Sequence, residues 1–129
     1  MKRLLFASLM ILCSVCSMLA QGEAEITFEK NKHNFGAFSE KNPVVSCTFK
    51  FKNTGDHPLI IHQAIASCGC TVPSYPKHPI KPGEGGEVKI KYDGTGKFPG
   101  HFRKSITLRT NSKAEITRLY IEGNMTPDK

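Results

Sequence analysis

Hydrophobic and polar residues alternate over short stretches of this chain, with a period of two residues. In VSCTFKFK, residues 45–52, the odd positions are apolar and the even positions are polar. The stretch EITFE, residues 25–29, repeats the pattern with Ile26 and Phe28 on one face. Successive side chains of a β-strand point to opposite faces, so both stretches are predicted to be half-buried strands.

Further stretches have the composition of strands and are separated by turn-forming residues. Residues 58–65 are apolar enough for a central strand, and shorter alternating stretches lie around residues 88–92, 102–108 and 119–121. The segments between them are rich in Gly, Pro, Asn and Asp, which favour turns. No stretch of the chain shows helical periodicity over a useful length. The pattern therefore predicts an all-β, immunoglobulin-like β-sandwich of about seven strands.

The predicted core consists of the apolar residues that share the inner faces of these strands. It comprises Phe28, Phe49, Phe51, Leu59, Ile61, Val88, Ile90, Ile106, Leu108 and Ile121. Leu119 is expected to join Ile121 on the inner face of the last strand, with Ile116 as the alternative phase. The polar sequence from residue 124 onward is predicted to fray. At about 1.5–3 kcal/mol for each buried side chain, this core requires no disulfide to offset chain entropy.

The first twenty residues differ in character from the rest of the chain. Lys2 and Arg3 precede an uncharged apolar run over residues 4–20, and polar sequence follows. This arrangement is typical of a secretory signal peptide, so we predict cleavage after Ala20 and one mature domain over residues 21–129.

Two membrane-attached alternatives fit the N-terminal segment less well. A transmembrane anchor is disfavoured because the apolar run is short for a bilayer and has no positive flank after it. Lipid anchoring is disfavoured because neither Cys13 nor Cys16 follows a good lipoprotein sequence. We therefore expect a secreted or periplasmic protein with no transmembrane segment after signal cleavage.

The mature part is basic, but its charges are not arranged as in a nucleic-acid-binding surface. The whole chain has 18 Lys and Arg residues against 11 Asp and Glu, a net charge of +7. Loss of Lys2 and Arg3 with the signal peptide lowers the net charge to about +5. The lysines mostly alternate with apolar residues, as on solvated strand faces, so we expect no nucleic-acid partner.

Three cysteines remain in the mature part, and they are the main candidates for chemistry. Cys68 and Cys70 lie two residues apart, so their thiols share a face if the segment is extended. They could bind a soft metal such as Cu(I), with His62 as a third candidate ligand, cycle as a redox pair, or supply a reactive thiolate. The interpretation we favour is structural: buried thiols, or a disulfide between one of the pair and Cys47, whose phase directs it into the core.

No other motif brings together the groups that catalysis needs. The histidines are scattered, and the glycine-rich segment at residues 81–86 lacks the Gly-Lys-Ser/Thr ending and the helix of a phosphate loop. Asp93-Gly94-Thr95-Gly96 is predicted to be a hairpin turn rather than half of an aspartic protease site. We therefore expect a non-enzymatic protein without a cofactor.

Taken together, several segments resemble the bacterial family called domain of unknown function 1573. In chain order they are HNFG at 33–36, FKFKNTG at 49–55, PLII at 58–61, ASCGCT at 66–71, PIKPGE at 79–84, YD at 92–93, Gly96, PG at 99–100, TN at 110–111 and IEG at 121–123. The resemblance implies an exported single domain with an immunoglobulin-like sandwich. It also implies a distant similarity to modules of abnormal-spindle and Hydin proteins, which act in assembly and scaffolding. It implies no established activity, ligand or catalytic residue.

These observations favour an exported, non-enzymatic binding or assembly module of the bacterial cell envelope. The expected partner is another envelope or extracellular protein, contacted through edge strands or loops, because the edges of an open sandwich keep unpaired backbone groups. The alternative is a thiol-based protein that uses Cys68 and Cys70 for Cu(I) binding or redox chemistry.

Overall fold

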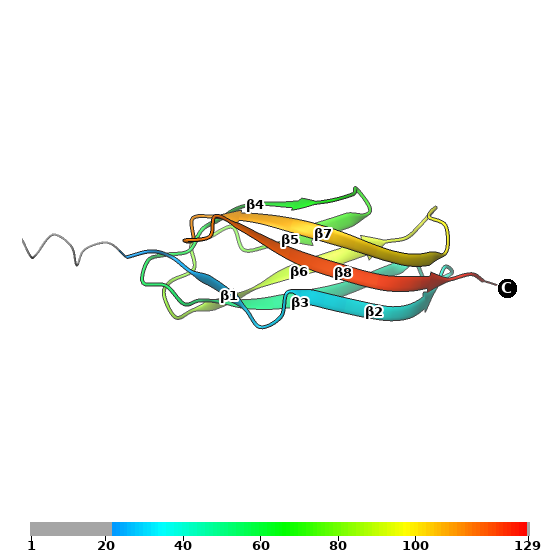
Figure 1. Cartoon of the computed structure of the whole chain (residues 1–129), viewed down its shortest axis with the longest axis horizontal. Helices are drawn as coiled ribbons and strands as arrows, with labels where there is room; N and C mark the ends of the chain where they lie inside the picture. Colours follow the sequence, from blue (N-terminus) through cyan, green and yellow to red (C-terminus); the bar gives the residue numbers. More distant parts are fainter. Residues whose placement is uncertain (1–21, 129) are drawn as a thin grey trace, which may run out of the picture.

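The computed structural model describes residues 22–128, which form eight strands in two packed sheets (Figure 1). The strands are β1 (Ile26–Phe28), β2 (Lys32–Ser39), β3 (Val44–Asn53), β4 (Ile61–Ala66), β5 (Thr71–Ser74), β6 (Gly85–Asp93), β7 (Gly100–Thr110) and β8 (Ile116–Thr126). The first sheet has the order β1-β3-β6-β5 and the second the order β2-β8-β7-β4. This arrangement confirms the predicted all-β, immunoglobulin-like sandwich. The predicted signal peptide, residues 1–20, lies outside the described residues, and within the described part no helix could cross a bilayer.

Two strands, β2 and β5, escaped prediction because each interrupts the alternating pattern. In β2, Gly36 adopts a φ of 70° and the pairing with β8 shifts between Asn34 and Ala37, so the apolar residues before and after this bulge differ in phase. β5 contains Pro73, which lacks the N–H of a central strand and is tolerated because β5 lies at the edge of its sheet.

The prediction that residues 58–65 form a central strand is wrong. β4 begins only at Ile61 and is the outermost strand of the second sheet. Leu59, just before it, forms an isolated bridge with Ile80 and is fully buried. The apolar run suggested burial of both faces, but Ile60 and Ile65 are 38% and 47% exposed.

In the second sheet, β2 and β8 pair in parallel, although they come first and last of its strands along the chain. The other strand pairs are antiparallel. The N-terminal segment therefore contributes β1 to one sheet and β2 to the other. Ala24 bridges Ser112 at one end of the long axis, while Met125 pairs with Gly100 at the opposite end. The two ends of the described chain accordingly lie at opposite ends of the sandwich (Figure 1).

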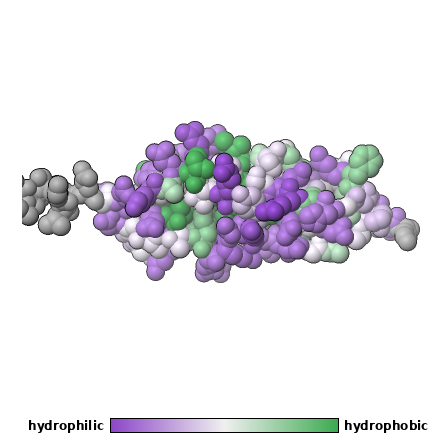
Figure 2. All heavy atoms as spheres, viewed as in Figure 1, coloured by the Kyte–Doolittle hydropathy of each residue, from purple (hydrophilic) through white to green (hydrophobic). Residues whose placement is uncertain are grey.

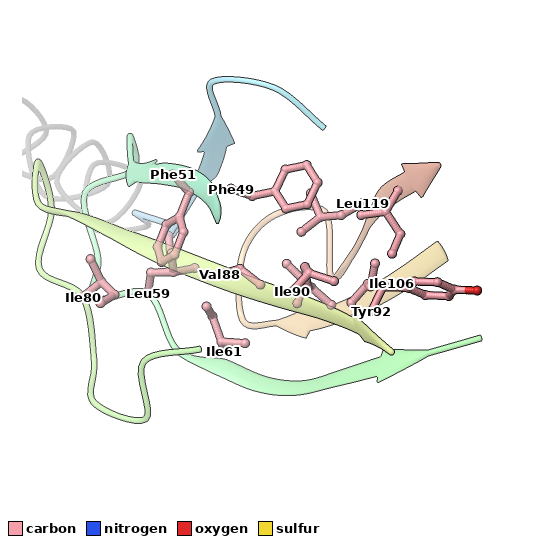
Figure 3. Close-up of a cluster of buried hydrophobic side chains, with 13 residues drawn as sticks. Phe49, Phe51, Leu59, Ile61, Ile80, Val88, Ile90, Tyr92, Ile106 and Leu119 are labelled. Carbon is pink, nitrogen blue, oxygen red and sulfur yellow. The ribbon is translucent and has the colours of Figure 1, made fainter. Parts of the chain in front are cut away.

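A single hydrophobic core fills the space between the sheets (Figure 3). Nine of the ten predicted core residues are buried, and the tenth, Phe28, is partly buried against the others. Leu119 is buried and Ile116 is exposed, which settles the phase of β8. The predicted fraying from residue 124 is wrong, because β8 continues and buries Met125. A Cβ on residue 94 would lie 2.8 Å from the Met125 sulfur, so any larger residue at Gly94 would displace the Met125 side chain.

A fully buried polar side chain, that of Asn53, connects the end of β3 to three neighbouring segments. Its Nδ2 donates to the carbonyl oxygens of His57 and Ile80, at 2.7 and 2.9 Å. Its Oδ1 accepts from the backbone N–H groups of Glu25 and Gly55, at 3.3 and 3.0 Å. These four contacts use both N–H donors and both lone pairs of the amide. The segments before β1, after β3 and before β6 thus share one hydrogen-bonding centre.

We predict that Asn53→Ala lowers the free energy of unfolding by about 3 kcal/mol, because it leaves buried backbone groups without partners. Denaturant unfolding followed by circular dichroism measures this loss. Asn124→Ala is the matched control: Asn124 is exposed on β8, its side chain makes no hydrogen bond within residues 22–128, and its loss should cost less than about 0.5 kcal/mol. Equal losses in the two variants would contradict the role assigned to the Asn53 amide.

Candidate functional site

The Cys68-Gly69-Cys70 segment forms the loop that carries the chain from β4 in one sheet to β5 in the other. The structure pairs Cys68 with Cys70 as a disulfide, with their Cα atoms 5.3 Å apart. Both ends of the loop are anchored on central strands. The Ser67 N–H donates to the Ser105 carbonyl at 2.9 Å, and the Asp93 N–H donates to the Cys70 carbonyl at 2.8 Å. The loop is therefore held at one edge of the sandwich.

Cys47 takes no part in this loop. It lies on the inner face of β3 opposite Ile90, with a free and partly buried thiol, so the structure corrects the expected bond to Cys68 or Cys70. β5 is two strands away from β3, about 10 Å at ordinary strand spacing, which exceeds the roughly 7 Å limit between disulfide-bonded Cα atoms. Burial raises the pKa of the Cys47 thiol to about 11, and the positive charge of Lys30 opposes this shift.

His62 is likewise separated from the cysteine pair. It is the second residue of β4, whereas Cys68 follows the other end of that strand, and a rise of about 3.3 Å per residue places them well over 10 Å apart. Within residues 22–128, no three His, Cys, Asp or Glu side chains are grouped to hold a metal ion. The set of Cys68, Cys70 and His62 expected for Cu(I) is therefore not assembled.

The sandwich has four edge strands, and three of them carry features that oppose further pairing. β1 is only three residues long. β5 contains Pro73, and the N–H of Thr71 is already used by the Cys68 carbonyl at 3.2 Å. β2 carries Lys32 and the bulge at Gly36. Short strands, prolines, lysines and bulges all disfavour edge-to-edge association.

β3 also has an unpaired stretch, residues 44–48, because it extends past the short β1. Lys30 lies near this stretch, because the N–H of the preceding Glu29 donates to the Lys50 carbonyl at 3.1 Å. A lysine beside an edge must lose hydration when another strand approaches, which disfavours pairing here too.

β4 also has a register shift, between Ile61 and Gln63, but beyond this shift residues 63–66 carry none of these features. Its sequence, IHQAIA, contains no Lys, Arg, Asp, Glu, Pro or Gly. The Ser67 N–H bonds to β7, and in an antiparallel ladder alternate residues direct their backbone groups to the same side. The backbone N–H and C=O groups of Ile65 therefore also face β7, and those of Ala64 and Ala66 face outward. These outward groups have no hydrogen-bond partner within residues 22–128. The structure thus presents a short, uncharged and unpaired strand edge.

The open part of β4 is framed at both ends. At its start, the Tyr75 hydroxyl donates to the His62 carbonyl at 3.4 Å, and the Lys77 ammonium lies 3.4 Å from the centre of the Tyr75 ring. At its end stands the disulfide loop. Figure 2 shows hydrophobic atoms gathered over β4, in keeping with the exposed Ile60 and Ile65. Composition alone could not reveal this site, because an edge position depends on which strands pair.

Comparisons with known structures agree on the fold. A protein of unknown function from Porphyromonas gingivalis W83 matches with a TM-score of 0.65 and 17% identity, over 81% of this chain and 47% of that one. The ASH/PapD-like domain 7 of human CEP192 matches with a TM-score of 0.65 and 9% identity, over 83% and 89%. The Pseudomonas aeruginosa CupB2 chaperone matches with a TM-score of 0.52 and 14% identity, over 78% and 55%. This chain spans about half the length of the P. gingivalis protein.

At these identities the structural similarity establishes the fold alone. Among curated proteins, none is similar enough in sequence to match. A family model does match, over residues 26–125, and its description is "Protein of unknown function (DUF1573)". This match covers most of the chain and confirms the resemblance drawn from the sequence motifs, so the protein belongs to the DUF1573 family.

Proposed function

We propose that this protein is an exported, non-enzymatic binding or assembly module of the bacterial cell envelope, and that it binds a partner protein by accepting a strand at β4. The observation that carries the proposal is the contrast among the edge strands. Beyond the register shift at its start, β4 is uncharged and unpaired over residues 63–66, whereas the other edges are only three residues long or carry proline or lysine. Proteins normally protect an edge of this kind, so one left open is suited to accept a partner strand.

Strand addition uses groups that are present on β4. Ala64 and Ala66 each direct one N–H and one C=O outward, which provides up to four backbone hydrogen bonds to an extended segment. Side chains of the added strand alternate between the two faces, so some of them would lie beside the exposed Ile65. The backbone supplies affinity and the flanking side chains supply selectivity.

The envelope location rests on the predicted signal peptide, residues 1–20, with lipid anchoring as the weaker alternative. The neighbour CupB2 is a chaperone, which is compatible with a role of this sandwich in binding other proteins. We propose a structural role for the cysteines: the Cys68–Cys70 disulfide closes the loop at the end of the open edge, and Cys47 is a core thiol.

Photo-crosslinking tests the position of the partner. With benzoylphenylalanine in place of Gln63 on β4, illumination of cells should give one discrete adduct with an envelope protein, which mass spectrometry identifies. The same probe at Ser46 on β3 or Ser74 on β5, both exposed, should give none, because those edges disfavour pairing.

Ala64→Pro is the test of backbone pairing. It removes an outward N–H that the fold does not use, so the adduct from Gln63 should disappear while circular dichroism retains the strand signal. Adducts of equal strength from Ser46 and Ser74, or an adduct that persists in folded Ala64→Pro protein, would count against strand addition at β4.

Thiol alkylation tests the structural role of the cysteines. At pH 8, a thiol with a pKa of about 11 has about 100-fold less thiolate than one at the ordinary value of 9.0, so iodoacetamide should modify native Cys47 about 100-fold more slowly than in unfolded protein. Peptide mass spectrometry measures both rates. The folded pKa lies above the unfolded one, so the stability contributed by the buried neutral thiol is complete below about pH 9 and is lost as the pH rises toward 11.

Cys68 and Cys70 should resist alkylation until a reductant is added, because they are paired. Rapid modification of both in untreated native protein would favour the thiol-based alternative over the proposed structural disulfide.

A further inference from the structure

The arginines of the described strands lie on one outer face of the sandwich, and most of the outward-facing lysines lie on the other. All three arginines of residues 22–128 lie on the outer face of the second sheet: Arg103, Arg109 and Arg118, on β7 and β8. We call this surface the arginine face. The outer face of the first sheet carries four lysines instead: Lys50, Lys52, Lys89 and Lys91. We call it the lysine face. Lys32 lies at the margin of the arginine face, beside Tyr120.

The strand registers place the arginines on one continuous surface. Arg109 lies opposite Ile116, Thr107 opposite Arg118, and Arg103 opposite Glu122. Residues that oppose one another in an antiparallel pair share a face, and so do alternate residues along a strand. Figure 2 shows this face toward the viewer, with strongly hydrophilic side chains over β7 and β8.

The arginines have no anionic partner within the described part of the chain. The ion pairs of residues 22–128 involve Lys41, His57 and His101, and none includes an arginine. Glu122, the acidic residue of this face, lies 3.3 Å from the His101 ring nitrogen. The Arg103 guanidinium carbon lies 5.0 Å from the centre of the Tyr120 ring, so a stacking contact orients this side chain while its N–H groups remain available.

The residue types of the arginine face are those of a protein interface. Tyr120 and the exposed Ile65 and Ile116 lie among the arginines. Protein interfaces are enriched in Arg and aromatic residues and depleted in Lys, and in these residue types this face differs from the lysine face. Both faces carry exposed apolar side chains, which on the lysine face are Val44 and Val72. An anionic membrane, by contrast, attracts Lys and Arg alike and would engage the four lysines of the opposite face at least as strongly.

We infer that the arginine face binds an acidic extended segment of a partner protein, an inference that rests on the proposed protein-binding role. The planar guanidinium group matches a carboxylate through two parallel hydrogen bonds, which an ammonium group cannot make. The face begins at the open edge, because Gln63 lies opposite Arg109 and Ile65 lies opposite Thr107. Alternate side chains of a strand added to β4 point to this same face, and carboxylates among them meet Arg109 first.

The test uses a fluorescent peptide of alternating Glu and Thr, blocked at both ends, and the purified full chain at low ionic strength. Replacing Arg103, Arg109 and Arg118 together by Gln should weaken binding about tenfold, the sum expected for three exposed ion pairs. The matched control replaces Lys50, Lys89 and Lys91 by Gln, which removes the same charge from the opposite face and should leave binding within about twofold. An Arg→Lys triple variant should bind at an intermediate level, because charge is kept and the paired hydrogen bonds are lost.

Three outcomes would overturn the inference. Equal weakening by the Arg→Gln and Lys→Gln triples would show attraction by net charge alone. Equal binding of a control peptide in which Gln replaces every Glu would show that carboxylates are not recognised. Tighter binding to phosphatidylglycerol–phosphatidylcholine vesicles than to the peptide, dependent on the same arginines, would assign the face to lipid. Ala64→Pro separates the two proposals. If it leaves peptide binding intact while the Arg→Gln triple weakens binding about tenfold, the arginine face stands and strand addition at β4 does not.

Discussion

The buried amide of Asn53 connects parts of the chain that no β-ladder joins, and the position of the open edge depends on it. Its contacts hold the carbonyl groups of His57 and Ile80 at the end of the sandwich. Ile80 in turn exchanges two backbone hydrogen bonds of 2.8 Å with Leu59, which is the last buried residue before β4. The amide therefore determines where the chain leaves the first sheet and enters the second. A hydrophobic contact lacks the directionality to do this, whereas four hydrogen bonds from one planar group fix position and orientation together.

Several features of the fold could be predicted from alternation, because a strand with one buried face must place its apolar residues at every second position. Phe49, Phe51, Val88 and Ile90 were assigned to the core on this basis, and the structure buries each of them. The pattern failed where local geometry breaks the period, as at the Gly36 bulge in β2. It also failed where a long-range pairing decides the outcome, because the edge position of β4 is not encoded within its own stretch. Met125 is in phase with Leu119 and Ile121, but the polar residues around it concealed that β8 continues.

The candidate site was harder to predict from the sequence than the core, because it depends on which strands pair and in which register. The cysteines attracted attention because of their chemistry, but disulfide pairing depends on distances between strands, and Cys47 is two strands away from the pair. The edge of β4 and the arginine face are defined by pairing and register rather than by any short motif. Arg103 and Arg118 are fifteen positions apart in the sequence and share a face only because β7 and β8 form a hairpin of a particular register. The sequence motifs did identify the family, because segments such as FKFKNTG at 49–55 and PIKPGE at 79–84 form an ordered set along the chain, and the family model matches residues 26–125.

The parallel pairing of β2 with β8 has a mechanical consequence. Lys32 pairs with Tyr120 and Ser39 with Thr126, so the N-terminal end of β2 and the C-terminal end of β8 lie at opposite ends of the ladder between them. Tension applied to these two ends slides one strand along the other. In this shear geometry the hydrogen bonds between the two strands share the load and must break together, instead of opening one at a time like a zipper. A ladder loaded in this way resists stretching along β2 and β8, and the outer edge of β4 lies on the far side of the same sheet, two strands away from β8.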